Sequence, residues 1–226
     1  MTAPRRICLI HTTPLMVQLF TPLCRDQLPD VKVTQIINES MIKDTIEAGR
    51  VRQPTIDALI TFADACFKMG TELVMVTCSS IGPAVDLIQG RFQKPVLRVD
   101  EPMAEASVAK GRRIGVAATL RTTLEPTTEL LRRKAREVGK EVELVECLCE
   151  GAFEAVMAGD VETHDAMVSK VMTNKLGDVD VIVLAQASMA RVAERLPRDA
   201  LTAPVLSSPE LAMEYVRERL ARLRPN

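Results

Sequence analysis

The sequence lacks an excess of charge of either sign. Lys and Arg total 29 and Asp and Glu total 30, so the formal net charge is −1, and both signs are scattered along the chain. Proteins that bind nucleic acid concentrate Lys and Arg into a basic face that neutralises phosphates. Nucleic acid is therefore not expected as a partner.

Long hydrophobic runs are also missing. No apolar run in the sequence approaches the roughly 20 residues that cross a bilayer. The N-terminal stretch 7–20 is interrupted by His11, Thr12, Thr13, Pro14 and Gln18. The sequence therefore predicts neither a membrane span nor a secretion signal. We expect a cytoplasmic protein with no membrane partner.

The sequence has no cysteine cluster of the kind that binds a metal. Cys8, Cys24, Cys66 and Cys147 lie in apolar segments, and a chain of 226 residues does not need disulfides to fold. Cys147 and Cys149 are separated by one residue, but no further Cys or His cluster accompanies them. We expect reduced thiols and no metal site.

What the sequence does contain is an internal repeat. Its period of about 108 residues is too long for a solenoid, whose repeats run about 20 to 50 residues, so two related half-domains are expected to face each other across a cleft. The 47% hydrophobic and 26% charged composition is that of a globular protein with a substantial core. The matching segments are 5–7 with 112–114, 72–80 with 180–188, and 95–97 with 204–206.

Apolar segments alternate with segments of helical spacing, which predicts an α/β fold of two pseudo-symmetric, doubly wound lobes. Each lobe is expected to hold a four-stranded, mainly parallel sheet covered on both faces. The predicted lobes are 1–100 and 101–208, and 209–226 is expected to form a C-terminal helix that can pack back onto the first lobe. The predicted strands are 5–11, 32–38, 72–77, 95–99, 112–118, 142–148, 180–185 and 203–207. The predicted helices are 14–28, 53–69, 81–90, 101–111, 122–138, 152–175, 188–196 and 209–223.

Cys78 stands at a predicted strand-to-helix corner, and such corners at the carboxyl ends of strands are where ligands bind in these sheets. The helix is expected to begin near Ser79 or Ser80, so its dipole would lower the pKa of the thiol and suit a nucleophile or general base. The alternative is a small buried residue at a turn. The polar neighbours Thr77, Ser79 and Ser80 favour the functional interpretation.

Several motifs together resemble the aspartate/glutamate racemase superfamily, which includes hydantoin racemases, maleate isomerase and arylmalonate decarboxylase. The motifs are Val76-Thr77-Cys78-Ser79-Ser80, the segment from Ile114 to Thr123, Leu184-Ala185-Gln186-Ala187, and Pro204-Val205-Leu206-Ser207-Ser208. The resemblance covers nearly the whole chain. It implies a cofactor-independent enzyme, an active site in the cleft between the lobes, and a homo-oligomer.

Racemases of that family use two cysteines, one on each side of the substrate. Cys78 matches the first, whereas Gln186 stands at the second position, and an amide has no proton to exchange near neutral pH. Family members with one cysteine carry out other reactions, such as protonating an enediolate after decarboxylation or attacking a double bond. Gln186 is expected either to hydrogen-bond a substrate carbonyl or amide, with help from Ser188, or to cap the helix that follows.

Hydroxyl side chains follow most of the other predicted strands. As a set at matching strand ends, they provide neutral donors that can hold a small carboxylate without a buried cation, although each one alone is more often a helix cap. The expected substrate-binding hydroxyls are Thr12, Thr13, Ser79, Ser80, Thr119, Thr122, Thr123 and Ser188, and Ser207 and Ser208 follow the last strand.

The sequence contains two histidines. His11 closes the first predicted strand on the ligand side, where it is either an acid, base or hydrogen-bond donor near Cys78 or a satisfied rim histidine. His164 lies among charged residues in a predicted helix, which indicates a surface position. Charged residues elsewhere are expected to orient substrate or form a solvated ion pair at Arg98, Asp100 and Glu101, and to cover exposed helix faces over 130–140 and 217–224.

The leading hypothesis is a cofactor-independent isomerase or racemase-family enzyme that acts on a small carboxylate or carbonyl compound. Cys78 would be its acid/base or nucleophile, and Gln186 would be its second catalytic residue. One alternative is a decarboxylase, lyase or hydrolase of the same family that uses a single cysteine. A second is a small-ligand-binding protein without catalysis, which the missing second cysteine suggests.

Overall fold

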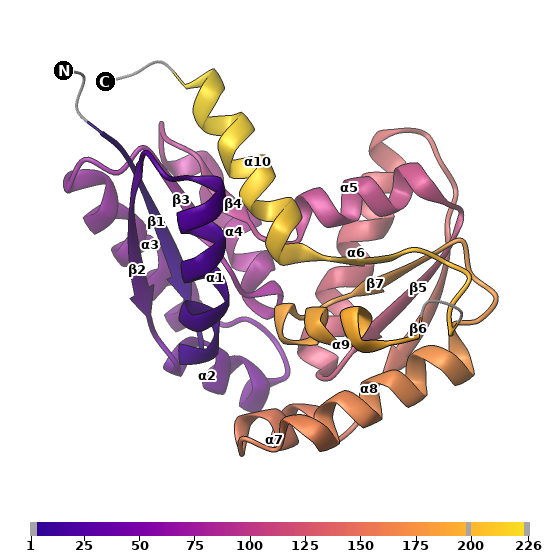
Figure 1. Cartoon of the computed structure of the whole chain (residues 1–226). Coiled ribbons are helices and arrows are strands. Elements are labelled where there is room, and N and C mark those ends of the chain that lie inside the picture. The colour runs from indigo at the N-terminus through magenta and orange to yellow at the C-terminus, as the bar shows by residue number, and fades with distance from the viewer. Residues whose placement is uncertain (1–3, 198–199, 224–226) are drawn as a thin grey trace. The chain divides into compact units, whose positions relative to one another are not determined.

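The computed structural model describes residues 4–197 and 200–223. The chain divides into two units, one formed by Met1–Asp100 with Pro209–Asn226 and the other by Glu101–Ser208 (Figure 1). Each unit contains a four-stranded sheet in which all paired strands run parallel. The predicted fold class, α/β with two related lobes, is confirmed.

The sheet of the first unit has the strand order β2-β1-β3-β4. The central strand β3 is buried along its whole length, because helices cover both faces, and the edge strand β2 is only partly buried. This explains why β3 is an unbroken run of Val, Leu and Met rather than an alternating pattern. The strands are β1 (Arg5–His11), β2 (Val31–Ile37), β3 (Leu73–Val76) and β4 (Val96–Arg98).

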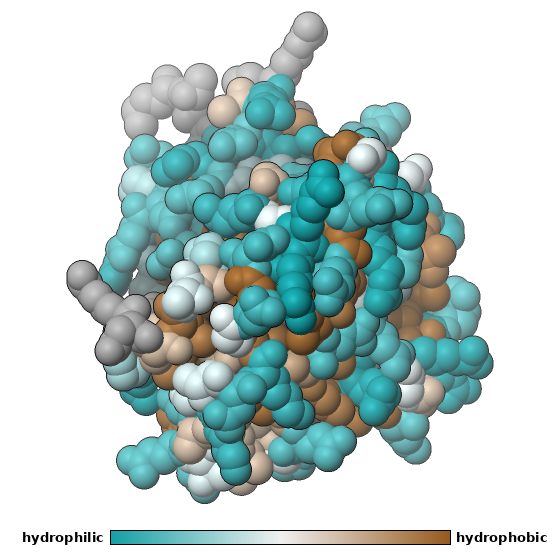
Figure 2. Space-filling model, turned by 90° about the vertical axis from the view of Figure 1, so that its right-hand side faces the viewer, coloured by the Kyte–Doolittle hydropathy of each residue, from teal (hydrophilic) through white to brown (hydrophobic). Residues whose placement is uncertain are grey.

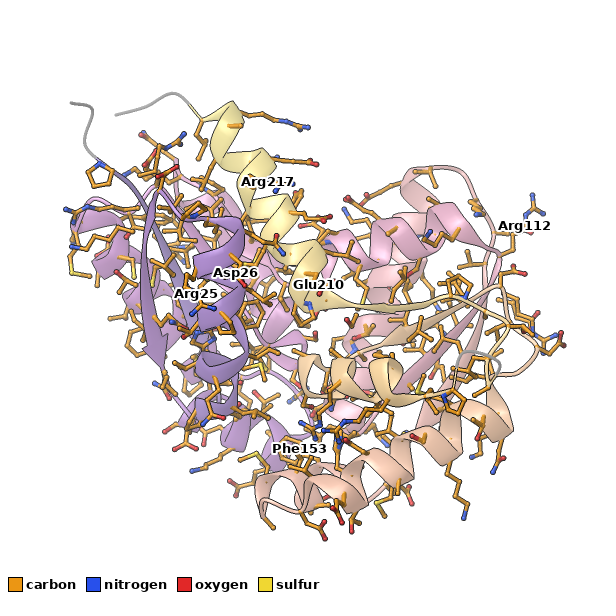
Figure 3. All side chains as sticks on the ribbon, viewed as in Figure 1. Arg25, Asp26, Arg112, Phe153, Glu210 and Arg217 are labelled. Atoms are coloured by element: carbon orange, nitrogen blue, oxygen red, sulfur yellow. The ribbon has the colours of Figure 1, made fainter. Side chains whose placement is uncertain are left out.

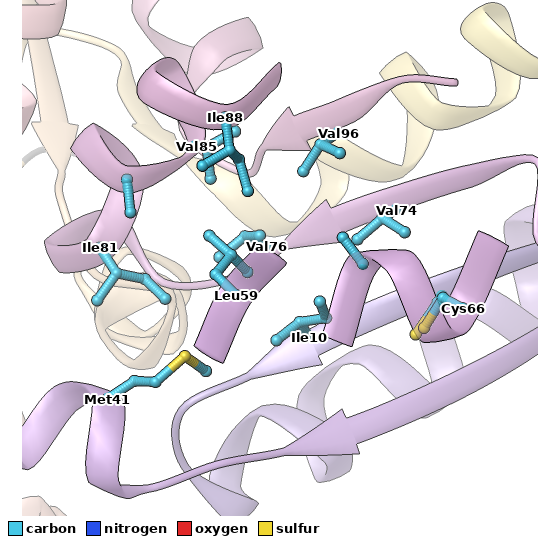
Figure 4. Packing of buried hydrophobic residues seen from close by; sticks show 13 residues of the cluster. Ile10, Met41, Leu59, Cys66, Val74, Val76, Ile81, Val85, Ile88 and Val96 are labelled. Carbon is cyan, nitrogen blue, oxygen red and sulfur yellow. The ribbon is translucent and has the colours of Figure 1, made fainter. Parts of the chain in front are cut away.

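Alternate residues of each strand face opposite layers of helices. On one face, Val74 and Val76 pack with Leu59 of α3 and Val85 of α4 in a closed apolar cluster (Figure 4). On the other face, Cys24 of α1 contacts Met213 of α10, with 3.7 Å between their sulfur atoms. The helices of this unit are α1 (Pro14–Gln27), α2 (Ser40–Ala48), α3 (Gln53–Lys68), α4 (Gly82–Ile88) and α10 (Ser208–Arg222), with 3₁₀ turns η1 (Ser79–Ile81) and η2 (Gln89–Arg91).

The second unit repeats this plan with the strand order β6-β5-β7-β8. Its strands are β5 (Arg113–Ala118), β6 (Glu143–Leu148), β7 (Val181–Leu184) and β8 (Val205–Ser207). Its helices are α5 (Glu101–Lys110), α6 (Arg121–Glu137), α7 (Ala152–Met157), α8 (Val161–Lys175) and α9 (Ala190–Arg195), and η3 (Ala187–Met189) is a 3₁₀ turn. Each strand lies within two residues of its predicted bounds.

Two predictions about the helices are wrong. The short helix α2 was not predicted, because only Met41, Ile42 and Thr45 of its nine residues are buried and the rest are mostly polar. The predicted helix 152–175 is two helices, α7 and α8. Gly159 separates them with a left-handed φ of 85°, and the Asp160 carboxylate then caps α8 by accepting a hydrogen bond from the Thr163 N–H.

His164 is buried rather than on the surface. Its Nδ1 lies 2.8 Å from the Asp165 carboxylate, which also accepts hydrogen bonds from Arg191 at 3.0 Å and Arg195 at 2.9 Å. Arg191 and Arg195 belong to α9, and Arg191 is 26 residues beyond Asp165 in the chain. Their positive charges balance the buried Asp165 carboxylate, and the residues around His164 in the sequence do not reveal this. The cluster joins α8 to α9.

Lys134 is also buried, although it lies within the run 130–140 that was predicted to form an exposed face. Its ammonium group contacts Glu101 at 2.7 Å and Glu105 at 2.8 Å, both on α5, and Glu137 at 3.3 Å. Burial opposes its charge, but the hydrogen bonds and charges of Glu101 and Glu105 outweigh burial and raise the pKa of Lys134. The ion cluster therefore ties α6 to α5.

The outer surface carries most of the remaining charge. Arg25 and Asp26 project from α1 and form an exposed ion pair at 3.1 Å, and Arg217 projects from α10 (Figure 3). The face shown in Figure 2 is mostly hydrophilic, with smaller hydrophobic areas between the charged side chains. Within the described part of the chain, no helix combines the length and apolarity that a membrane crossing requires.

Gly115 provides a test of the packing of the second sheet. A Cβ atom added there would lie 2.9 Å from Leu176 and 3.3 Å from Val179, so the β5 backbone and these side chains leave no room for a side chain. We expect Gly115→Val to lower the free energy of unfolding by about 1–3 kcal/mol, as measured in urea. Gly177→Val is the matched control, because Gly177 is exposed and its nearest neighbouring atom is 4.0 Å away. Equal stability of the two variants would contradict this account.

Candidate active site

Two corners occupy matching places in the two units, one after β3 and one after β7. Cys78 and Gln186 have similar extended backbones, with φ and ψ of −128° and 113° and of −114° and 140°, and each precedes a 3₁₀ turn and a short helix. The strand registers agree as well, because Ile10 pairs with Val76 and Ala117 pairs with Leu184. The repeat therefore extends to the conformation of the corners.

The Cys78 side chain is half-buried and packs against the apolar cluster on the α3 and α4 face of its sheet. Burial raises the pKa of the Cys78 thiol, and hydrogen bonds from Thr12, from Ser80 and from the backbone of Ile81 oppose that effect. The prediction of a lowered pKa is therefore wrong. The polar groups partly stabilise a thiolate, but the cost of removing its charge from water is larger.

Gln186 binds Thr119 at the end of β5. The Thr119 N–H donates to Gln186 Oε1 at 2.8 Å, and Gln186 Nε2 donates to the Thr119 hydroxyl at 2.6 Å. Its side chain makes no helix-capping hydrogen bond, so the capping alternative is not observed. One N–H of the amide and one lone pair of its oxygen remain beyond these two bonds.

Thr12 and Thr119 show that both corners follow one plan. In each unit, a threonine just after the first strand of the sheet hydrogen-bonds the side chain at the end of the third strand: Thr12 with Cys78, and Thr119 with Gln186. The two units differ in what the threonine holds. A thiol can gain and lose a proton, whereas an amide at neutral pH cannot.

The predicted hydroxyls lie at these same strand ends and most are buried. Thr13 occupies the cap position of α1, yet its side chain makes no cap hydrogen bond. The Thr122 hydroxyl is buried in the first turn of α6 and has no protein partner among the described residues. The first unit brings Thr12, Thr13, Ser79 and Ser80 to the end of its sheet near Cys78, and the second brings Thr119, Thr122, Thr123 and Ser188 to the end of its sheet near Gln186.

His11 does not share the Cys78 side of the sheet. Its fully buried ring lies near Phe20 of α1, with 5.9 Å between ring centroids, and its nitrogens contact the Thr77 hydroxyl at 2.6 Å and Gln35 Oε1 at 2.9 Å. Gln35 Nε2 donates to Thr21 at 3.0 Å, which leaves its oxygen to accept from His11 Nε2–H. Burial lowers the pKa of His11 and outweighs the opposing effect of Gln35, so the ring is neutral near pH 7. His11 therefore supports Thr77, the neighbour of Cys78.

Arg98 is a functional candidate whose burial the sequence did not predict. The predicted solvated ion pair with Asp100 is buried, because the two side chains are 4% and 0% exposed. Burial opposes the charge of Arg98, but Asp100 and Asp86 outweigh it and raise the pKa of the guanidinium. Gly82 in the first turn of α4, where a guanidinium packs, was the available signal in the sequence.

Metal-binding groups do not converge in the part of the chain that the structure describes. No three His, Cys, Asp or Glu side chains there are placed to hold an ion. At the Cys78 corner, a thiol lies among neutral hydrogen-bond donors, a combination that can transfer a proton or attack as a nucleophile.

Comparison with known proteins identifies a family for the chain as a whole. Residues 7–216 match the model of the Asp/Glu/hydantoin racemase family. No curated protein sequence gives a significant match.

Solved structures share the fold at low sequence identity. A glutamate racemase from Bacillus anthracis superposes with a TM-score of 0.74 at 14% identity, over 96% of this chain and 82% of that one. An aspartate racemase from Picrophilus torridus gives 0.72 at 13% identity, over 97% and 96%. The allantoin racemase from Klebsiella pneumoniae gives 0.69 at 16% identity, over 98% and 90%. At such identities the likeness shows the fold.

Proposed function

Because the chain belongs to the Asp/Glu/hydantoin racemase family, we propose that it is a cofactor-independent enzyme that acts on a small carboxylate or carbonyl compound. Cys78 is its acid/base or nucleophile. The observation that carries this proposal is the unequal pair of corners, in which Thr12 holds a thiol and Thr119 holds an amide.

The surroundings of Cys78 favour a proton donor. A raised thiol pKa keeps the S–H bond intact near neutral pH, so the resting group can give its proton to a carbanion and become a thiolate. Thr12, Ser80 and the backbone at Ile81 then stabilise the thiolate as it forms. A resting nucleophile would need the opposite shift of pKa.

Gln186 has a different role in this proposal. It does not act as an acid or base near neutral pH, but its second amide N–H can bind a substrate carbonyl while the first donates to the Thr119 hydroxyl. Ser188 and the buried Thr122 hydroxyl add neutral donors in the same unit. This arrangement favours a one-cysteine reaction, such as decarboxylation followed by protonation, over racemisation by two thiols.

The test is a screen of small carboxylates in heavy water, followed by NMR and chiral chromatography. The set contains amino acids, hydroxy acids and substituted malonates. Deuterium incorporation or loss of carboxylate with a product of one configuration supports the one-cysteine reaction, and exchange with inversion supports racemisation. Saturable carboxylate binding without turnover, together with iodoacetamide reacting with Cys78 no faster than with free cysteine, would instead identify a binding protein.

A further inference from the structure

Arg98 stands at the end of β4, behind the Cys78 corner. In the sheet register it pairs with Val76, two residues before Cys78. Its guanidinium is held by Asp100 through a pair of hydrogen bonds at 2.9 and 2.8 Å, and by Asp86 of α4 at 2.5 Å. A guanidinium fixed in this way has a defined plane and position, which a lysine would not have.

That guanidinium lies directly against Gly82, the first residue of α4. A Cβ atom on Gly82 would lie 2.5 Å from Nη2, 2.6 Å from Cζ and 2.7 Å from Nε of Arg98. The φ of Gly82 is −50°, so the backbone conformation does not require glycine there. The close approach of Arg98 is therefore the reason for a glycine at this position.

Gly82 is also the end of the turn that carries the groups around the thiol. Its N–H donates to the Ser79 carbonyl, and the Ile81 N–H donates to the Cys78 carbonyl at 3.3 Å. Within this turn, the backbone at Ser80 and Ile81 hydrogen-bonds the Cys78 thiol. A displacement of Gly82 would therefore move the donors that surround the sulfur.

The matching corner of the second unit lacks this arrangement. The counterpart of Gly82, at the start of α9, is Ala190, and the counterpart of Arg98 in the strand register is Ser207, which pairs with Leu184. With a small side chain in place of the guanidinium, that corner accommodates a Cβ. The buried arginine is therefore present behind the Cys78 corner and absent at the matching Gln186 corner.

We propose that Arg98 is a positioning residue for Cys78, which it serves by holding Gly82 and the turn 79–81 in place. Asp86 and Asp100 fix the arginine from both sides. This inference rests on the proposed function only for its catalytic meaning, because its physical content concerns the thiol and is measurable without a substrate.

The experiment measures the rate of alkylation of Cys78 by iodoacetamide as a function of pH, in the full-length protein, with mass spectrometry identifying the modified residue. The other five cysteines are buried and serve as internal references. Gly82→Ala leaves every charge in place and displaces the guanidinium. We expect alkylation near pH 8 to slow about tenfold, with the pH profile moved to higher pH, because the thiolate loses donors.

Two further variants keep the test decisive. Arg98→Lys retains the charge without the planar fork and should give a smaller shift in the same direction. The triple variant G82A/R98S/D100N introduces the alanine and serine of the second unit, removes the carboxylate that would be left unpaired, and should slow alkylation as Gly82→Ala does. Lys134→Met is the control, because it removes a buried cation from the other unit and should leave Cys78 unchanged.

The outcomes separate the two proposals. Folded Gly82→Ala or triple variants whose alkylation profile is unchanged or moved to lower pH would overturn the positioning role, as would an equal shift in Lys134→Met. A wild-type protein without turnover, whose variants nevertheless show the expected shifts, would remove the proposed enzymatic function and leave the positioning role supported.

Discussion

Replacing Cys78 by serine is expected to lower turnover about a thousandfold, with little change in substrate binding. A serine hydroxyl keeps the hydrogen-bonding capacity of the corner, but its proton is far harder to remove or replace than that of a thiol, and general acid–base catalysis contributes about 10²–10⁴-fold to a rate. The fall should therefore appear in kcat rather than in KM. The measurement is steady-state kinetics on the substrate identified by the heavy-water screen.

Cys24→Ala is the matched control for that substitution. Cys24 is a buried thiol on α1 that contacts Met213, and it lies on the opposite face of the sheet from the Cys78 corner. Its loss should lower stability slightly and leave kcat unchanged. Full turnover in Cys78→Ser would show that Cys78 is not the catalytic thiol.

The second large effect is the loss of stability at acidic pH. We expect the free energy of unfolding to fall as the pH is lowered below about 6.5, by up to about 1.4 kcal/mol per pH unit for each histidine. Burial lowers the pKa of both His11 and His164 in the folded protein. The unfolded chain therefore takes up protons near the ordinary histidine pKa while the folded chain does not, and stability is lost as the pH falls through that range.

Urea unfolding at a series of pH values between about 7 and 5 measures this slope. His164→Asn is the informative variant, because its amide can still donate to Asp165 in place of Nδ1 but does not titrate. It should reduce the slope by about half, since the chain contains two histidines. A wild-type slope of zero, or an unchanged slope in the variant, would contradict the neutral burial of these rings.

The strands were predictable because they consist mainly of apolar residues, which indicates that they are buried. A run such as Leu73–Val76 must be covered on both faces, and strand length then follows from the turn residues at its ends. Helix α2 was not predictable in this way, since only three of its nine residues are buried, and Met41 packs with Ile10 and Val76, which lie on other elements. The break at Gly159 was readable, because glycine followed by aspartate ends one helix and begins the next.

Some residues of the candidate site were predictable from the sequence and others were not. The repeat alone identified Cys78 and Gln186 as counterparts, and the structure gives them matching conformations. The burial of Arg98 and His164 was not predicted, because part of what stabilises each comes from another element: Asp86 of α4 contacts Arg98, and Arg191 of α9 binds the Asp165 carboxylate that His164 contacts. His11 was ambiguous for the same reason, since its partner Gln35 lies on the neighbouring strand.

The first unit is discontinuous, because α10 belongs to it while residues 101–208 form the other unit. The Leu220 carbonyl accepts a hydrogen bond from Arg5 at 2.8 Å, which joins α10 to β1 within that unit. On the ribosome, the second unit is therefore complete before the first, which reverses the usual N-terminal-first order of domain folding. The β1–β4 sheet lacks the packing of α10 until that helix emerges, so apolar surface of the first unit stays exposed while the second unit is being made.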